Sequence, residues 1–160
     1  MFNVRHLVLA ILVASAGCGA DSTRPPDLAP VVTGKWRMAS FDGLTVPATY
    51  AEFLDEPVDD RIVDVVIRLD SATKEFRADS TYVRVYYFTE IQDGEVAFRY
   101  LWGDHGRFSI AGRDPAAITL TSEYYENLGA AGQVAATGDI QLIEPLWVGE
   151  DPRSTTWVKR

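Results

Sequence analysis

Apolar and polar residues alternate with a period of two along most of the chain that follows Gly34. In the first such stretch, Trp36 and Met38 alternate with Lys35 and Arg37. A period of two places alternate side chains on opposite faces of a β-strand, so each stretch predicts a strand with one buried face. The same alternation recurs at residues 63–69, 95–102, 108–110, 118–121 and 140–142.

Turn-forming residues separate these stretches and divide the chain into about eight or nine expected strands. Asp42-Gly43 and Gln92-Asp93-Gly94 are expected to close hairpins, because Asp-Gly pairs tolerate the backbone conformations of tight turns. Residues 81–89 carry apolar side chains at both parities, which is typical of a central strand. Further turns are expected at residues 71–73 and 103–106, and the last strand at residues 155–159.

Two segments do not follow the strand pattern. Residues 47–60 form a long acidic connection, in which a single helical turn is compatible with residues 50–54. Residues 124–132 are compatible with either a short helix or a loop. The acidic residues of the first segment are Glu52, Asp55, Glu56, Asp59 and Asp60.

Short strands joined by short turns in sequence order predict an up-and-down meander. Closing such a sheet into a barrel removes the exposed edges that would otherwise promote aggregation. The expected fold class is therefore all-β, an antiparallel up-and-down barrel of about eight strands. Strand parity assigns the following side chains to its interior: Trp36, Met38, Val63, Val65, Ile67, Leu69, Val83, Val85, Tyr87, Val96, Phe98, Tyr100, Trp102, Phe108, Ile110, Ile118, Leu120, Ile140 and Leu142.

The start of the first strand resembles a motif of the lipocalin family. Gly34-Lys35-Trp36 is similar to the G-x-W of lipocalins, whose tryptophan closes one end of the barrel. The resemblance implies that a basic residue near the last strand packs over Trp36, with Lys159 and Arg160 as candidates. The lipocalin T-D-Y motif is absent, and the closer likeness is to short lipocalin-like domains of bacterial lipoproteins. The resemblance implies binding of a small apolar molecule in the barrel.

The residues at the start of the chain are typical of a secretion signal. A basic residue, Arg5, precedes an apolar run at residues 7–14. The next four residues, Ser15-Ala16-Gly17-Cys18, resemble the lipobox of bacterial lipoproteins, in which the cysteine is acylated and becomes the first residue of the mature chain. Ala14-Ser15-Ala16 also fits ordinary signal cleavage, which would leave a soluble protein that begins at Gly17.

The lipobox interpretation divides the chain into a signal peptide at residues 1–17, a lipid-anchored tether at residues 18–33 and a lipocalin-like barrel domain at residues 34–160. The tether is rich in proline and lacks aromatic residues, so we expect it to stay extended. Lipidation at Cys18 would anchor the protein in the bacterial cell envelope. Gly19 follows the cysteine, which by analogy with enteric-type lipoproteins implies the outer membrane, facing the periplasm.

Charge and cysteine content restrict the classes of function. The chain of 160 residues carries a net charge of -8 and a single cysteine. An acidic surface disfavours nucleic acid and anionic lipid as partners, so membrane attachment is expected only through the anchor at Cys18. A lone cysteine cannot form an internal disulfide, so the fold must depend on core packing and strand pairing.

The sequence contains no recognisable motif for catalysis, a cofactor or a metal. His105, the only histidine after the signal, lies in a segment with turn character. The acidic residues of residues 47–60 lack the spacing of a calcium loop. No G-x-S-x-G turn presents a serine to a base. We therefore expect no enzymatic activity, no catalytic residue, no metal and no cofactor.

Two functional hypotheses remain open. In the first, the barrel binds a small apolar ligand through aromatic side chains, which combine a wide apolar contact with a polar tip. The candidate lining residues are Tyr87, Phe98, Tyr100 and Trp102. In the second, the barrel is filled and acts as a structural or protein-interaction module in the envelope, with an unidentified protein partner. Its expected outer surface includes Tyr82, Arg84, Tyr86 and Phe88.

Overall fold

The computed structural model describes residues 29–112 and 115–160. Over these residues the fold is all-β apart from the short helix α1 (Ala29–Val32). No helix within the described ranges is long and apolar enough to cross a membrane. The strands are β1 (Gly34–Phe41), β2 (Leu44–Thr45), β3 (Ala48–Val58), β4 (Arg61–Phe76), β5 (Thr81–Gln92), β6 (Glu95–Ala111), β7 (Ala116–Ser122), β8 (Ala130–Val134), β9 (Ile140–Glu144) and β10 (Arg153–Lys159).

Eight of these strands close into an antiparallel barrel. The sheet runs in the order β1-β10-β9-β8-β7-β6-β5-β4, and β4 pairs back with β1. This closing pair extends from Gly34 opposite Phe76 to Arg37 opposite Thr73. From β4 to β10, neighbours in the sequence are neighbours in the sheet, and β2 and β3 are additions at its two ends. The expected up-and-down antiparallel barrel is therefore confirmed.

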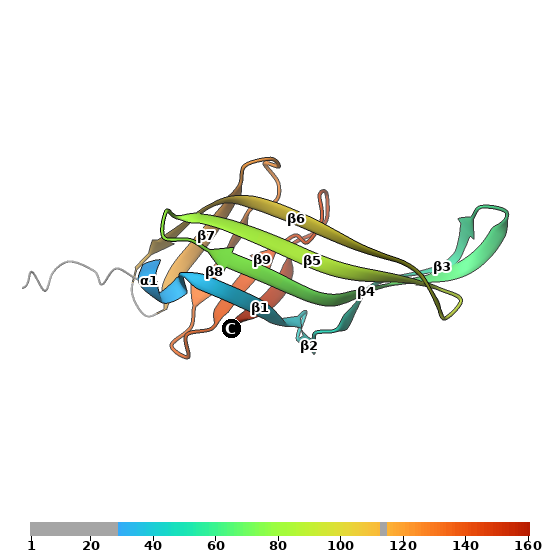
Figure 1. Ribbon diagram of the computed structural model, residues 1–160, viewed down its shortest axis with the longest axis horizontal. Coiled ribbons are helices and arrows are strands. Elements are labelled where there is room, and N and C mark those ends of the chain that lie inside the picture. The colour runs from blue at the N-terminus through green and yellow to red at the C-terminus, as the bar shows by residue number, and fades with distance from the viewer. Residues whose placement is uncertain (1–28, 113–114) are drawn as a thin grey trace, which may run out of the picture.

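Part of the sheet extends beyond the barrel. The first part of β4 pairs with β3 instead of β1, and β5 and β6 continue beside it to their turn at Asp93 and Gly94. Within the described residues, β6 pairs with β7 only from Gly106 onward. The extension leaves one end of the barrel, whereas α1 lies at the opposite end (Figure 1). We call residues 48–66 and 88–99 the projecting sheet.

Trp36 closes the barrel at the end where α1 lies. Its indole is buried, and its Nε1 donates a hydrogen bond of 2.7 Å to the carbonyl oxygen of Val32. The ammonium of Lys159 lies 5.8 Å from the centroid of the Trp36 ring and donates to the carbonyl oxygen of Val31. The basic residue expected over Trp36 is therefore Lys159.

A short part of the expected tether is described by the structure. Residues 29–32 belong to the expected tether, but they form α1, and Val32 is fully buried in the core. Val32 covers apolar surface at the barrel end. The expected signal peptide, Cys18 and most of the expected tether lie outside the described residues.

Three expected connections turn out to be strands. Residues 47–60 are mostly β3 rather than a loop with a helical turn, and residues 71–73 lie inside β4, next to a register shift between Leu69 and Ser71. Residues 103–106 lie inside β6, where glycine permits a close approach between strands. A Cβ atom at Gly106 would clash with the carbonyl oxygen of Thr121 on β7. Residues 124–129 form a loop, and β8 starts at Ala130.

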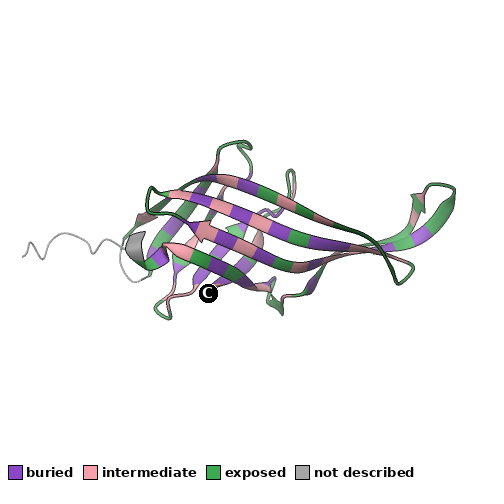
Figure 2. Ribbon diagram, viewed as in Figure 1, coloured by how far each residue is buried: buried purple, intermediate pink, exposed green. Residues whose placement is uncertain are grey.

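Burial alternates along the barrel strands, as Figure 2 shows. The predicted interior parity is correct for β1, β4, β7, β9 and the barrel part of β6, and it is wrong for β5. There the inward side chains are Tyr82, Arg84, Tyr86 and Phe88, which sequence analysis expects on the outer surface. Both parities of β5 are rich in apolar residues, so alternation alone could not decide between them.

Candidate functional site

Four charged side chains meet inside the barrel. Lys74, Arg84 and Asp104 are cross-strand neighbours on β4, β5 and β6, and Glu144 reaches them from β9. All four side chains have no solvent-exposed surface. Two cations face two carboxylates, so the group is neutral as a whole. We call these four residues the charged core.

Glu144 accepts hydrogen bonds on both carboxylate oxygens. Its Oε2 accepts from Lys74 Nζ at 2.7 Å and from Arg84 Nη1 at 3.0 Å. Its Oε1 accepts from Thr155 Oγ1 at 2.7 Å and from Trp157 Nε1 at 3.0 Å. The ammonium of Lys74 also lies 4.1 Å from the centroid of the Trp157 ring. The carboxylate therefore joins β10 to β4 and β5 across the barrel.

Asp104 on β6 has a similar set of hydrogen-bond and ion-pair partners. Its Oδ2 accepts from Tyr82 OH at 2.9 Å and lies 3.1 Å from Arg84 Nη2. Its Oδ1 accepts from Ser122 Oγ at 2.7 Å. Arg84 Nη2 also donates to the carbonyl oxygen of Leu128 at 2.7 Å. Every charged group of the core is thus paired and hydrogen-bonded, as burial in a low-dielectric interior requires.

The two cations of the charged core keep the carboxylate of Glu144 ionised. Burial alone would raise the pKa of Glu144, but the charges of Lys74 and Arg84 hold this pKa at about 2. Burial lowers the pKa of Lys74 to about 8, and the attraction of Glu144 opposes that change. Burial also raises the pKa of Tyr86 well above its usual value. At neutral pH, Glu144 is therefore an anion that is held by the cations Lys74 and Arg84.

The charged core and its neighbours fill the barrel at this level. One layer nearer α1, Phe76 and Tyr82 are cross-strand neighbours, and one layer nearer the projecting sheet, Ala72 and Tyr86 are neighbours. All of these side chains are buried. Solvent does not reach the charged groups, and their contacts link β4, β5, β6, β9 and β10 across the interior.

The charged core was not predicted from the sequence, although the parity of two of its residues indicates that they face inward. Glu144 continues the inward parity of Ile140 and Leu142, and Lys74 has the parity of Phe76. Opposite charges at inward positions of two predicted strands indicate a buried ion pair. The inward position of Asp104 was not predicted, because residues 103–106 were expected to form a turn rather than part of a strand.

Three of the four candidate ligand-binding residues lie together on one face of β6. Phe98, Tyr100 and Trp102 have the same parity and follow one another from the projecting sheet to the barrel. Phe98 is 61% exposed, whereas Tyr100 and Trp102 are partly buried against the core. We call these three residues the aromatic stripe.

The aromatic stripe packs on aromatic residues of neighbouring segments. The Tyr100 ring stacks on Phe88 with centroids 5.5 Å apart, and the Trp102 ring stacks on Tyr86 at 5.6 Å. Trp102 also lies 5.5 Å from Trp147 in the loop between β9 and β10. The stripe thus connects the buried core to the exposed face of the projecting sheet.

Tyr87, the fourth candidate, lies on the opposite face of the sheet. It is 41% exposed and pairs with Leu101 on β6. A surface hollow of about 320 Å³ lies beside these two residues, and it is also lined by Asp70, Phe88, Arg99 and Tyr100. Tyr87 therefore shares a hollow with Tyr100 but lies on the opposite face of the sheet from the aromatic stripe, because β5 has the opposite parity to the one predicted.

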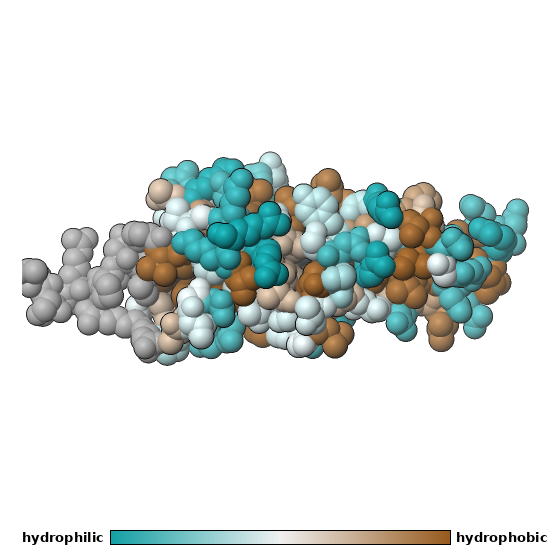
Figure 3. Space-filling view, turned by 60° about the horizontal axis from the view of Figure 1, so that its bottom comes forward, coloured by the Kyte–Doolittle hydropathy of each residue, from teal (hydrophilic) through white to brown (hydrophobic). Residues whose placement is uncertain are grey.

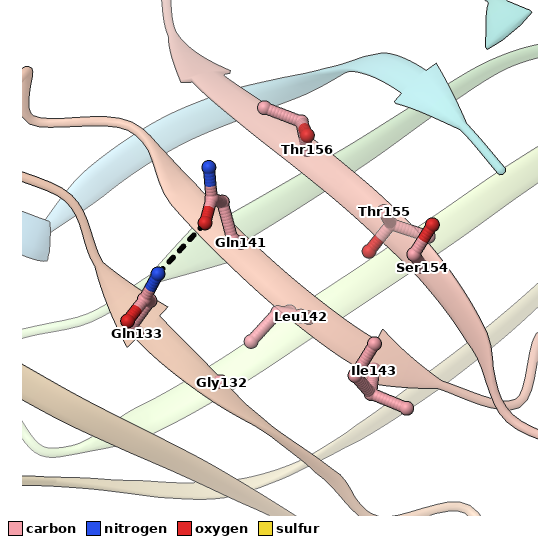
Figure 4. Close-up of a pocket in the computed structure, with 8 residues that line it drawn as sticks. All are labelled: Gly132, Gln133, Gln141, Leu142, Ile143, Ser154, Thr155 and Thr156. Carbon is pink, nitrogen blue, oxygen red and sulfur yellow. Dashed lines mark hydrogen bonds between the residues drawn. The ribbon is translucent and has the colours of Figure 1, made fainter. Parts of the chain in front are cut away.

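A larger hollow lies on the outer face of β8, β9 and β10, with a volume of about 500 Å³. Figure 4 shows the amides of Gln133 and Gln141 beside it, joined by a hydrogen bond of 2.8 Å, with Ser154 and Thr156 on β10. Gly132 contributes no side chain, and a Cβ atom there would clash with the carbonyl oxygen of Gln141 on β9. The hollow is lined by uncharged side chains, both polar ones and the apolar Leu142 and Ile143.

The remaining sequence candidates lie on two different parts of the sheet. His105 lies in β6 rather than in a turn, and its Nε2 lies 3.4 Å from a carboxylate oxygen of Glu123, with both side chains partly exposed. Among the residues that the structure describes, no three histidine, cysteine, aspartate or glutamate side chains converge as a metal site requires. The acidic residues of residues 47–60 instead lie on β3 and at its turn into β4.

Comparisons with known proteins return no relative. No protein-family model, no curated protein and no solved structure matches the chain significantly. The molecule is therefore described by its fold and its surfaces: an antiparallel β-barrel with a charged core and a projecting sheet.

Proposed function

We propose that the protein is a lipid-anchored envelope protein whose filled β-barrel acts as a protein-interaction module through its projecting sheet. The observation that carries this proposal is the contrast between the two halves of one continuous sheet. In the barrel, the inward face is closed by the charged core and the buried aromatic residues. On the projecting sheet, the same face exposes Phe53 and Phe98.

The position of α1 supports the same proposal. The proposed anchor, Cys18, precedes α1 in the chain, and α1 lies at the barrel end opposite the projecting sheet (Figure 1). An anchor attached through that end would leave the projecting sheet directed away from the membrane. Exposed apolar side chains gathered at one end of a domain are characteristic of contact surfaces.

A small apolar ligand remains a second candidate, and the aromatic stripe is the observation that favours it. Tyr100 and Trp102 are partly buried and lie where the barrel opens toward the projecting sheet. A compact guest could stack on these rings without entering the filled interior. In this alternative, Phe98 would cover the guest from the outer side.

Photo-crosslinking in the native envelope separates these candidates. With benzoylphenylalanine in place of Phe98 in the full-length protein, we expect a crosslink to another protein. The matched control has the same probe in place of Tyr124, which is 69% exposed in the loop after β7. The control should give no such product, because Tyr124 lies outside the projecting sheet.

The masses of the crosslinked products identify which candidate holds. A mass increase of small-molecule size at Phe98 would support the ligand alternative instead of a protein partner. Equal crosslinking from Phe98 and Tyr124, or no product from either, would contradict an interaction surface on the projecting sheet.

Acylation of Cys18 tests the proposed anchor independently. We expect the wild-type protein to incorporate labelled palmitate and to partition into detergent, and Cys18→Ser to lose both properties. The measurement is autoradiography of the purified protein after metabolic labelling, with a fractionation of the envelope. A wild-type protein found only in the soluble periplasmic fraction would show that ordinary signal cleavage operates.

A further inference from the structure

The projecting sheet carries almost all of the net charge of the protein. It holds nine acidic residues and two basic residues, Arg61 and Arg99, so its net charge is -7 out of the -8 of the whole chain. The remaining 14 acidic and 13 basic residues nearly cancel. The nine acidic residues are Glu52, Asp55, Glu56, Asp59, Asp60, Asp64, Glu90, Asp93 and Glu95.

These carboxylates have no cationic partners among the residues that the structure describes. Across the ranges that the structure describes, none of the nine lies within 4.0 Å of a lysine or arginine nitrogen. Asp64 and Asp93 accept hydrogen bonds from backbone amides, and Glu90 accepts one from Gln92. The negative charge of the projecting sheet is therefore left uncompensated toward solvent.

The same sheet exposes large apolar side chains between the carboxylates. Leu54 is 73% exposed and Ile62 is 63% exposed, and Phe53, Val96 and Phe98 are also exposed. Figure 3 shows hydrophobic and hydrophilic residues intermingled over this end of the molecule. In one cross-strand row, Phe98 neighbours Glu90, which neighbours Ile67 on β4. Apolar contact and negative charge thus occur on one surface.

A second copy of the chain does not fit this surface. Two projecting sheets in contact would bring two charges of -7 together, which like-charge repulsion disfavours. The outer edge of β3 is also unsuited to strand pairing, because Pro57 and two register shifts interrupt it. Such features are known to protect sheet edges against self-association.

We propose that the projecting sheet docks a cationic protein segment in which lysine or arginine residues are interspersed with large apolar side chains. This inference rests on the proposed interaction function and specifies the chemistry of the partner. The carboxylates attract and orient the basic segment, and Phe53 and Phe98, which share one face of the sheet, bury its apolar side chains. Charge complementarity of this kind mainly accelerates association, whereas the apolar contact slows dissociation.

The test measures binding of fluorescein-labelled synthetic peptides to the folded domain by fluorescence anisotropy. The probe is a peptide of alternating lysine and leucine. Two peptides of equal length serve as controls, one of glutamate and leucine and one of lysine and serine. We expect the lysine–leucine peptide to bind and both controls to bind at least roughly tenfold more weakly. Its affinity should fall roughly tenfold between about 0.02 and 0.2 M salt.

Matched variants show whether the binding belongs to the projecting sheet. Glu52→Gln/Asp60→Asn/Glu95→Gln removes three exposed carboxylates and should weaken binding by roughly tenfold. Glu123→Gln/Glu126→Gln/Asp151→Asn makes the same change in net charge on the barrel loops and should alter binding by less than about twofold. Phe53→Ser/Phe98→Ser should also weaken binding, whereas Tyr124→Ser should not. A cooperative thermal transition establishes that each variant is folded.

Several results would overturn the inference. These are equal weakening by the two triple variants, equal binding of the lysine–serine peptide, or self-association of the wild-type protein through Phe98 in sedimentation experiments. A crosslinked partner at Phe98 whose contact segment is acidic or neutral would also refute the cationic segment, while the proposed interaction function would stand. Absence of any protein crosslink at Phe98 would instead refute the proposed function itself.

Discussion

Replacing Glu144 by glutamine is expected to lower the free energy of unfolding by about 3 to 5 kcal/mol, because it leaves Lys74 and Arg84 buried without their anion. The variant keeps the shape of the side chain and removes only its charge. Chemical denaturation followed by tryptophan fluorescence measures the loss, since Trp157 donates to Glu144. Glu123→Gln, a partly exposed carboxylate near His105, is the control and should change stability by less than about 0.5 kcal/mol.

A double-mutant cycle distinguishes loss of the ion pair from general damage. Lys74→Met/Glu144→Gln removes both partners of the 2.7 Å contact, so its cost should be smaller than the sum of the two single costs. The difference should fall between about 0.5 and 3 kcal/mol. Additive losses, or a Glu144→Gln variant within about 1 kcal/mol of the wild type, would show that the charged core is not coupled as the contacts imply.

The same carboxylate gives the wild-type protein a defined response to acid. The pKa of Glu144 is lowered from 4.5 to about 2 in the folded state, so its contribution to stability is present above pH 4.5 and is lost as the pH falls toward 2. The shift corresponds to about 3 kcal/mol. Glu144→Gln lacks this titration, and the difference in stability between the two proteins should therefore shrink over that pH range.

Deleting residues 154–160 is expected to abolish folding, which is the largest effect that we predict. These residues form nearly all of β10, which pairs with β1 on one side and with β9 on the other. The deletion opens the barrel, removes the fully buried Trp157 and takes away two donors of Glu144. Circular dichroism in the near ultraviolet and a thermal scan should show neither fixed aromatic packing nor a cooperative transition.

The matched control is the deletion of Arg160 alone. This residue lies after β10, and its backbone amide donates one hydrogen bond to the carbonyl oxygen of Lys35. Its loss should leave a cooperatively folded protein, less stable by about 1 kcal/mol or less. A longer deletion that still melts cooperatively would mean that β1 and β9 tolerate open edges and that closure of the barrel is dispensable.

The alternation of residues was enough to predict the barrel, because a strand with one buried face needs apolar residues at every second position. A basic residue over Trp36 was also predicted, from a resemblance of three residues at the start of β1, and of the two candidates Lys159 and Arg160 the structure places Lys159 there. The aromatic stripe was assembled by the same rule, since Phe98, Tyr100 and Trp102 share one parity. These features depend on which residues follow one another within a short stretch of the chain.

The sequence could not define the orientation of β5, since apolar side chains occupy both of its parities. Only the tertiary structure decides that Arg84 faces inward, because Glu144 and Asp104 arrive from distant strands to neutralise it. It also decides that the acidic residues of residues 47–60 lie on a projecting strand, since β4 continues beyond its pairing with β1 and provides an edge for β3. Sequence pattern determined most of the barrel strands, whereas long-range pairing of charges and edges determined that residues 48–58 form a strand and which surfaces are closed or exposed.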